Sequence, residues 1–180
     1  MCILACDVGF RAFGWSVIKK GEVIDCGTII TEKSAKKTTR TADDYYSRST
    51  VIASALAEII KRHDIKGIVG ELPSGGAQSA KAMVMMNMAT AVVASVAAIL
   101  SIPCEWCSPT EVKIAVCGYR SATKHEIMTM IKNRFAGRGA ELFPEQLGHF
   151  EHIADSVGAY LALSNGNIVR MFGGMDGRLA

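Results

Sequence analysis

The chain has 180 residues, of which 49% are apolar and 21% are charged, and its formal net charge is +3. These values exclude an intrinsically disordered chain and favour one domain with a hydrophobic core, while the mild charge neither requires nor excludes a polyanionic partner. Six cysteines, several of them in apolar runs, and the lack of a secretion signal ahead of the first strand predict a cytoplasmic protein, either bacterial or, if viral, in the host cytoplasm.

The first forty residues predict a small antiparallel sheet and a basic connection. Apolar runs separated by turn residues indicate three strands in a meander, over residues 2–8, 13–19 and 22–30. Lys20 and Gly21 form the tight turn between the second and third strands. The segment "TEKSAKKTTR" (31–40) is polar and basic, so it is either a solvated loop or a loop that contacts phosphate groups.

A helix, a short strand and a strongly apolar helix follow. Thr41 is expected to cap the first helix, and the strand over 66–71 ends at Glu71. The Gly-rich stretch "LPSGGAQSAK" then leads into a helix over 82–100 that is apolar nearly all round. Such a helix lies in a protein core or in a subunit interface. A membrane span is the less favoured alternative, because polar residues interrupt the helix and no basic cluster flanks it.

The last part of the chain predicts one more strand and three helices. The strand covers 103–107, and the capping boxes "SPTE" (108–111) and "TKHE" (123–126) each begin a helix. The final helix runs from about 149 to 164. These elements predict the α/β class, with a mixed five-stranded sheet (antiparallel meander plus parallel strands) flanked by helices. We place one domain over 1–164 and a Gly-rich tail over 165–180.

Cys104 and Cys107 have the spacing of a zinc knuckle. A structural zinc ion needs four ligands, and the sequence offers no second cysteine pair to complete them. We therefore interpret both residues as core or strand cysteines.

Four residues form a candidate metal site. Asp7 lies in the first strand and Glu71 ends the fourth, and strands joined through a crossover helix are usually parallel and often adjacent. His152 and Asp155 are three residues apart on the last helix, so they share a face. Clustered carboxylates repel one another, and hard divalent cations such as Mg²⁺ relieve that repulsion. Two such ions can activate water for hydrolysis of a phosphodiester.

Each of these residues also has a plain structural interpretation. Asp7 before a glycine can form a turn, Glu71 can be a surface residue at a strand end, and His152 with Asp155 can be a solvated helix pair. The combination of all of them at strand ends and on one helix face favours a metal-dependent phosphoryl-transfer site.

The order of elements and the motifs resemble RuvC-type Holliday junction resolvases, which have a ribonuclease H-like fold. The likeness covers about residues 2–164. The opening "CDVGFRAFGWSVI" is similar to the family's Asp-x-Gly-x-x-x-x-Gly pattern, and "IVGELP" is similar to its second acidic motif. "SPTEVKIAVCGYRSATKHEIM" resembles its basic segment, and "HIADSVGAYLAL" resembles its C-terminal acidic helix, where some members carry Asp and others His at the position of His152.

The resemblance implies a metal-dependent endodeoxyribonuclease that resolves four-way junctions by two symmetric nicks. Asp7 would bridge two Mg²⁺ ions, which Mn²⁺ can replace, and Glu71 and Asp155 would each complete the shell of one ion. His152 would be a ligand or would handle protons near the attacking water. The DNA backbone would contact a basic set on the matching segment, namely Lys113, Arg120 and Lys124, for which the alternative is a solvated helix face. The resemblance also implies a homodimer through helix 82–100.

One departure from the family concerns junction opening. Family members often place an aromatic residue shortly after the second acid, whereas this chain has "LPSGG" (72–76). Other functions stay open as well: a ribonuclease H-like nuclease that cuts RNA or RNA–DNA hybrids, and a non-catalytic module that binds junctions. An ATPase of the actin and sugar-kinase type, which also opens with Asp-x-Gly, would need a second related half that 180 residues do not provide.

Overall fold

The computed structural model describes residues 1–73 and 79–173. Its centre is a five-stranded sheet in the order β3-β2-β1-β4-β5. The strands are β1 (Cys2–Asp7), β2 (Ala12–Lys19), β3 (Glu22–Ile30), β4 (Ile65–Glu71) and β5 (Cys104–Cys107). The first three strands pair antiparallel, while β4 and β5 extend the sheet in parallel to β1. This confirms the predicted mixed sheet.

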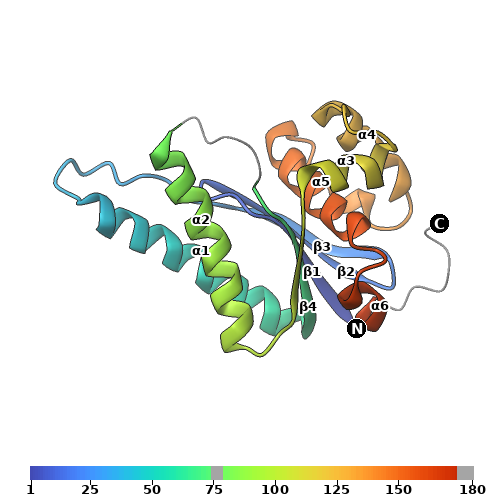
Figure 1. The fold of residues 1–180 in the computed structure, drawn as a ribbon, viewed down its shortest axis with the longest axis horizontal. Helices are drawn as coiled ribbons and strands as arrows, with labels where there is room; N and C mark the ends of the chain where they lie inside the picture. Colours follow the sequence, from blue (N-terminus) through green and yellow to red (C-terminus); the bar gives the residue numbers. More distant parts are fainter. Residues whose placement is uncertain (74–78, 174–180) are drawn as a thin grey trace.

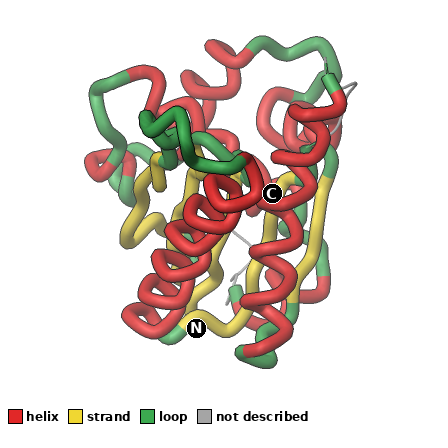
Figure 2. Tube along the Cα trace, turned by 90° about the vertical axis from the view of Figure 1, so that its left-hand side faces the viewer, coloured by secondary structure: helices red, strands yellow, loops and turns green. Residues whose placement is uncertain are grey.

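Helices cover both faces of the sheet (Figure 1). One layer consists of α1 (Thr41–His63) and α2 (Ala80–Ile99). The opposite layer contains α3 (Pro109–Cys117), α4 (Lys124–Arg134), the short 3-10 helix η1 (Ala140–Leu142) and α5 (Leu147–Ala162), and α6 (Asn167–Phe172) packs beside β4. The view turned by 90° shows the long helices running roughly along the strand direction (Figure 2).

Alternation of side chains along β1 divides the core into two halves. Leu4 and Cys6 pack with Ile52, Leu56 and Val93 on the α1–α2 side. Ile3 and Ala5 pack on the other side with residues of α5 such as Val157. Successive strand residues point to opposite faces, so Asp7 continues the row of Ile3 and Ala5 and faces α5. Burial of each of these large apolar side chains stabilises the fold by about 1.5–3 kcal/mol.

The predicted starts of α3 and α4 are confirmed, but that of α1 is wrong in detail. Ser108 and Thr123 accept hydrogen bonds from the third helical residue of α3 and α4, and complete capping boxes are present at both. Thr41 does not cap α1, because the N-cap is Arg40 and no side chain accepts a hydrogen bond there. The Arg40 guanidinium instead pairs with Asp43, its Nε lying 2.7 Å from Oδ2.

The predicted Gly-rich tail over 165–180 contains a short packed helix. Residues 167–172 form α6, in which Ile168 and Val169 are buried. The carboxylate of Glu105 in β5 accepts hydrogen bonds from the backbone amides of Asn167 (3.0 Å) and Ile168 (3.1 Å) and so caps this helix. The packed part of the domain therefore extends past residue 164, and residues 174–180 lie outside the described residues.

Cys104 and Cys107 lie in β5 and pack against the core, as we predicted. All six cysteines are free thiols. Cys104 packs with the core on the α1–α2 side, whereas Cys107 packs with the core on the α5 side. Side chains on opposite faces of a sheet cannot share one ion, so the "CEWC" pair does not form half of a zinc site.

Candidate active site

Asp7 and Glu71 lie side by side at one end of the sheet. Each is the last residue of its strand, and the two are register partners in the parallel pairing of β1 with β4. Val69 packs in the core on the α5 side, so Glu71, two residues later, faces α5 as Asp7 does. The predicted shared sheet region is therefore present.

Helix α5 brings the other two predicted residues to this sheet end. The Nδ1 atom of His152 lies 2.7 Å from Oδ2 of Asp7. Asp155 follows three residues later on the same helix, and its charge raises the pKa of Glu71. The four residues that the sequence singled out thus meet between the ends of β1 and β4 and the first half of α5.

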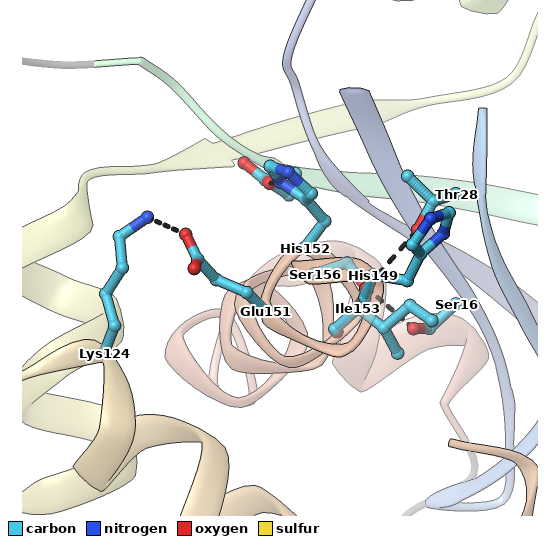
Figure 3. Close-up of polar contacts among 9 residues, drawn as sticks. Ser16, Thr28, Lys124, His149, Glu151, His152, Ile153 and Ser156 are labelled. Carbon is cyan, nitrogen blue, oxygen red and sulfur yellow. Dashed lines mark hydrogen bonds and ion pairs between the residues drawn. The ribbon is translucent and has the colours of Figure 1, made fainter. Parts of the chain in front are cut away.

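Close packing across the sheet fixes the position of α5. Gly14 of β2 lies under the backbone of His152, where a Cβ atom would collide with the carbonyl group. One helical turn further, the Ser16 and Ser156 hydroxyls form a buried hydrogen bond of 2.7 Å. Near the start of the helix, the Thr28 hydroxyl donates to the carbonyl oxygen of His149 at 3.4 Å (Figure 3). These contacts hold His152 over Asp7.

The pKa values of the acidic cluster are raised, as is typical of buried carboxylates that lie close together. Burial, followed by the charges of Asp155 and Asp7, raises the pKa of Glu71 to about 8. Burial and then the charge of Asp7 raise the pKa of Asp155 to about 7. The hydrogen bond to Asp7 raises the pKa of His152 and outweighs the opposing effect of burial. At neutral pH the site therefore holds protons that a cation would displace.

The cluster is not a closed ligand shell. Within residues 1–73 and 79–173, no three His, Cys, Asp or Glu side chains converge so that they could already hold a metal ion. One oxygen of Asp7 is taken up by His152. The donor chemistry nevertheless fits Mg²⁺, because three carboxyl groups supply oxygen ligands and the raised pKa values show that a positive charge would be stabilised there.

Of the three predicted DNA-contacting residues, the structure brings two to the cluster. Lys124 begins α4, and its charge lowers the pKa of both Glu71 and Asp155. Lys113 of α3 is half-buried and lowers the pKa of Glu71 as well. Arg120 lies exposed in the turn between α3 and α4, and in the described part of the chain it forms no ion pair.

Glu151 is a site neighbour that the predicted set did not contain. Its carboxylate pairs with the ammonium group of Lys124 across the gap between α5 and α4 (Figure 3). Burial lowers the pKa of Lys124, but this pair and the charges of Asp155 and Asp7 more than compensate, so the pKa is raised. The position of Glu151 directly before His152 is the one signal in the sequence that could have placed it at the site.

The stretch that departs from the family pattern after the second acid lies mostly outside the described residues. "LPSGG" runs into residues 74–78, which lie outside the described residues.

Comparison with known proteins agrees with this geometry. The family described as crossover junction endodeoxyribonuclease RuvC matches residues 3–138. RuvC of Chlorobaculum parvum is 28% identical over 182 aligned positions, which cover 98% of this chain and 89% of that protein.

Solved structures show the same fold. Thermus thermophilus RuvC in complex with Holliday junction substrate superposes with a TM-score of 0.72 at 20% identity, covering 91% of this chain and 93% of that chain. The yeast mitochondrial Holliday junction resolvase superposes with a TM-score of 0.59 at 11% identity, covering 89% and 76%. A ribonuclease H-like fold, an acidic cluster at its sheet end and a family match over three quarters of the sequence lead to one conclusion: the chain belongs to the RuvC family of crossover junction endodeoxyribonucleases.

Proposed function

We propose that this chain resolves four-way DNA junctions by paired symmetric nicks, and that each nick is made at the cluster of Asp7, Glu71 and Asp155. The observation that carries the proposal is the in-register placement of Asp7 and Glu71 beneath the face of α5 that holds His152 and Asp155. Family membership supplies the class of reaction, a divalent-metal-dependent endonuclease.

The metal would be held by Asp7, Glu71, His152 and Asp155, with two Mg²⁺ ions in each site and Mn²⁺ as a substitute. Such ions would supply an activated water and would stabilise the leaving oxygen, so the expected products of phosphodiester hydrolysis are a 5′-phosphate and a 3′-hydroxyl. The protein orients the ligands, because β1, β4 and α5 are rigid elements whose packing fixes the three backbones.

Lys113, Arg120 and Lys124 would hold the DNA backbone beside the cluster. Lys124 is suited to this role because its side chain is 65% exposed and its charge acts on both Glu71 and Asp155. Phosphate contacts of this kind fix the position of the nucleic acid and depend strongly on salt.

The second part of the proposal is a homodimer through α2. This helix is long and apolar enough to cross a membrane, and only three of its residues, Ala89, Val93 and Ala97, are buried in the monomer. It forms an apolar groove of about 380 Å³ with α1, lined in part by Met88, Val92, Val96 and Ile99. A two-fold contact would cover this face and would give the dimer one site for each of the two nicks. We expect such a soluble dimer in the cytoplasm and no membrane partner.

Substitution of an exposed residue in the groove tests the interface. Ala91→Glu places a charge at an exposed position of α2 without disturbing the monomer core, so we expect it to shift the protein from dimer to monomer in sedimentation experiments. Ala57→Glu on the exposed part of α1 is the matched control and leaves the dimer intact. A monomeric wild-type protein would contradict the interface.

The decisive test of the activity compares three substrates with Mg²⁺ present: a four-way DNA junction, an RNA–DNA hybrid duplex and linear duplex DNA. We expect paired, ligatable nicks in the junction alone, and loss of cleavage but not of junction binding in Asp7→Asn. Asp64→Asn is the matched control, since Asp64 is exposed and Asn also adopts its left-handed backbone conformation. Preferred cleavage of the hybrid would favour a ribonuclease, and junction binding without cleavage by wild type would favour a binding module.

A further inference from the structure

We propose that a basic pocket on the α1–α2 side of the sheet binds the phosphate backbone of a DNA arm, at a place separate from Lys113, Arg120 and Lys124. This inference rests on the proposed function for the identity of the polyanion. The pocket has a volume of about 880 Å³ and lies between the connection over residues 31–40, the start of α1 and the start of α2.

Positive charge is concentrated in this pocket. Its lining contains six basic and two acidic residues, which gives a local net charge of +4, whereas the whole chain carries +3. The basic residues are Arg11, Lys33, Lys36, Lys37, Arg48 and Lys81. The rest of the protein is therefore close to neutral, and a polyanion would be attracted to this surface.

A buried network orders the connection that carries the lysines. The guanidinium of Arg48 lies 3.7 Å from the carboxylate of Asp44, and both side chains are buried. Asp44 Oδ1 accepts a hydrogen bond from the backbone amide of Ser34 at 2.7 Å, and Arg48 Nε donates to Thr31 Oγ1 at 2.9 Å. Residues 31–40 are thus bound to α1 at their start, through Thr31, and near their middle, through Ser34. A solvated loop without a fixed position would lack these contacts.

The same network joins the connection to the turn that follows Asp7. Arg48 Nη2 donates to the carbonyl oxygen of Phe10 at 3.3 Å and the guanidinium stacks 4.3 Å above the Phe10 ring. The backbone amide of Thr31 donates to the carbonyl oxygen of Arg11 at 2.8 Å. The pocket is therefore built directly onto the β1–β2 turn.

The lysines over the pocket are free to bind. Lys33, Lys36 and Lys37 are exposed, and among the described residues none of them forms an ion pair. Asp44, in contrast, is already neutralised by Arg48. Unpaired lysines held by an ordered backbone match a phosphodiester chain, which offers repeated single charges.

The topology sets the pocket next to the candidate active site. Strands β1 and β3 run in the same direction, since each pairs antiparallel with β2, and Asp7 ends β1 where Ile30 ends β3. Residues 31–40 leave from this end toward the α1–α2 side, at the left of Figure 1, while Lys113 and Lys124 lie on the α5 side. A junction arm whose strand is cut at Asp7 would meet basic groups on both faces of the sheet.

The first test is a footprint on the wild-type protein. Lysine acetylation is measured by mass spectrometry without divalent metal, with and without junction DNA. We expect protection of Lys36 and Lys37 but not of Lys19 and Lys61, which are exposed and lie outside the pocket. Equal reactivity of Lys36 and Lys37 with and without DNA would overturn the proposal. So would equal protection by inorganic phosphate or a mononucleotide, which would assign the pocket to a small ligand.

The second test is a charge-matched pair of variants. Lys36→Gln/Lys37→Gln should weaken junction binding roughly tenfold at 0.1 M salt and should reduce the slope of log Kd against log salt by about 1 to 2. Lys19→Gln/Lys61→Gln should bind as wild type does. Equal affinity of the two double variants would overturn the proposal. Junction cleavage by the wild-type protein is measured separately. If DNA protects the lysines but the junction is not cut, the proposed nuclease function is wrong and the proposed phosphate-binding pocket is still supported.

Discussion

The imidazole Nδ1 of His152 lies 2.7 Å from Oδ2 of Asp7 and joins the first half of α5 to the last residue of β1. In the protonated form this contact is an ion pair, and the raised pKa of His152 shows that Asp7 favours that form. A metal ion at the proposed ligand Asp7 would have to displace the proton, so His152 would couple occupancy of the site to pH.

His152→Ala is expected to lower the cleavage rate by about 10- to 100-fold, because it removes a proposed metal ligand that also fixes the carboxylate of Asp7. His152→Asp should keep most of the activity and lose the part of the pH–rate profile that depends on deprotonation of the imidazole. Single-turnover cleavage of a junction across pH measures both. His149→Ala is the control, because His149 contacts the sheet through its backbone carbonyl oxygen, which the substitution keeps. A wild-type rate in His152→Ala would remove His152 from the site.

Glu71→Gln should abolish cleavage while stabilising the metal-free protein. The pKa of Glu71 rises from 4.5 to about 8 in the folded state, so the folded protein binds the proton more tightly than the unfolded chain. The free energy of unfolding therefore falls as pH rises from about 4.5 to 8. Gln removes this penalty, and we expect a gain on the order of 1–3 kcal/mol at pH 8 and above, or about 2–4 °C in Tm per kcal/mol.

Thermal melts at pH 5 and pH 8.5 without metal test this directly. Glu58→Gln, at an exposed position of α1, is the control and should leave Tm nearly unchanged. Addition of Mg²⁺ should raise the wild-type Tm more at pH 8.5 than at pH 5, because the ion then competes with fewer protons. A Glu71→Gln protein that is less stable than wild type at pH 8.5 would show that the carboxylate is not under electrostatic strain.

The pairing of Asp7 with Glu71 was accessible from the sequence for a simple reason. Two strands connected through a crossover helix are usually parallel and adjacent. Because side chains alternate between the two faces along a strand, the position of each acid in its strand then decides which face of the sheet it lies on. The contact between His152 and Asp7 was not accessible in this way. It depends on how far α5 slides along the sheet, and this is set by the close approach at Gly14 and by the Ser16–Ser156 hydrogen bond.

Two local expectations differ from the structure, for different reasons. The carboxylate that caps α6 belongs to Glu105, more than sixty residues upstream, and Gly67 of β4 makes room for Ile168 where a Cβ atom would collide. No pattern within residues 165–180 reveals these contacts. At the start of α1, Thr41 has the right chemistry for a cap but stands one residue inside the helix.

Lys124→Ala should weaken junction binding and reduce its salt dependence, because one phosphate contact is lost; we expect the slope of log Kd against log salt to fall by about 1. Glu151→Gln should act in the opposite direction, since it frees the Lys124 ammonium and removes a negative charge beside the cluster. Lys132→Ala, at an exposed position later in α4, is the control. Fluorescence titrations at several salt concentrations measure the slope, and an unchanged slope in Lys124→Ala would argue against a phosphate contact.

Gly14→Ala is expected to impair the site without touching any proposed ligand. The added methyl group would collide with the backbone carbonyl of His152, and neither β2 nor α5 can move freely because Ser16 and Ser156 join them one turn away. Relief of the collision must lift α5 from the sheet and carry His152 and Asp155 away from Asp7. We expect a loss of about 1–3 kcal/mol in stability, as for other overpacked positions, and a larger loss of cleavage than of junction binding.

Gly148→Ala in the same helix provides the contrast. A Cβ atom at Gly148 meets nothing within 4 Å, and alanine in a helix is favoured over glycine by about 0.5–1 kcal/mol. This variant should therefore be as stable as wild type or more so, and fully active. Urea unfolding and single-turnover cleavage of both variants decide the matter. If Gly14→Ala were as stable and as active as Gly148→Ala, the contact between β2 and α5 could not be what positions His152 and Asp155 over Asp7.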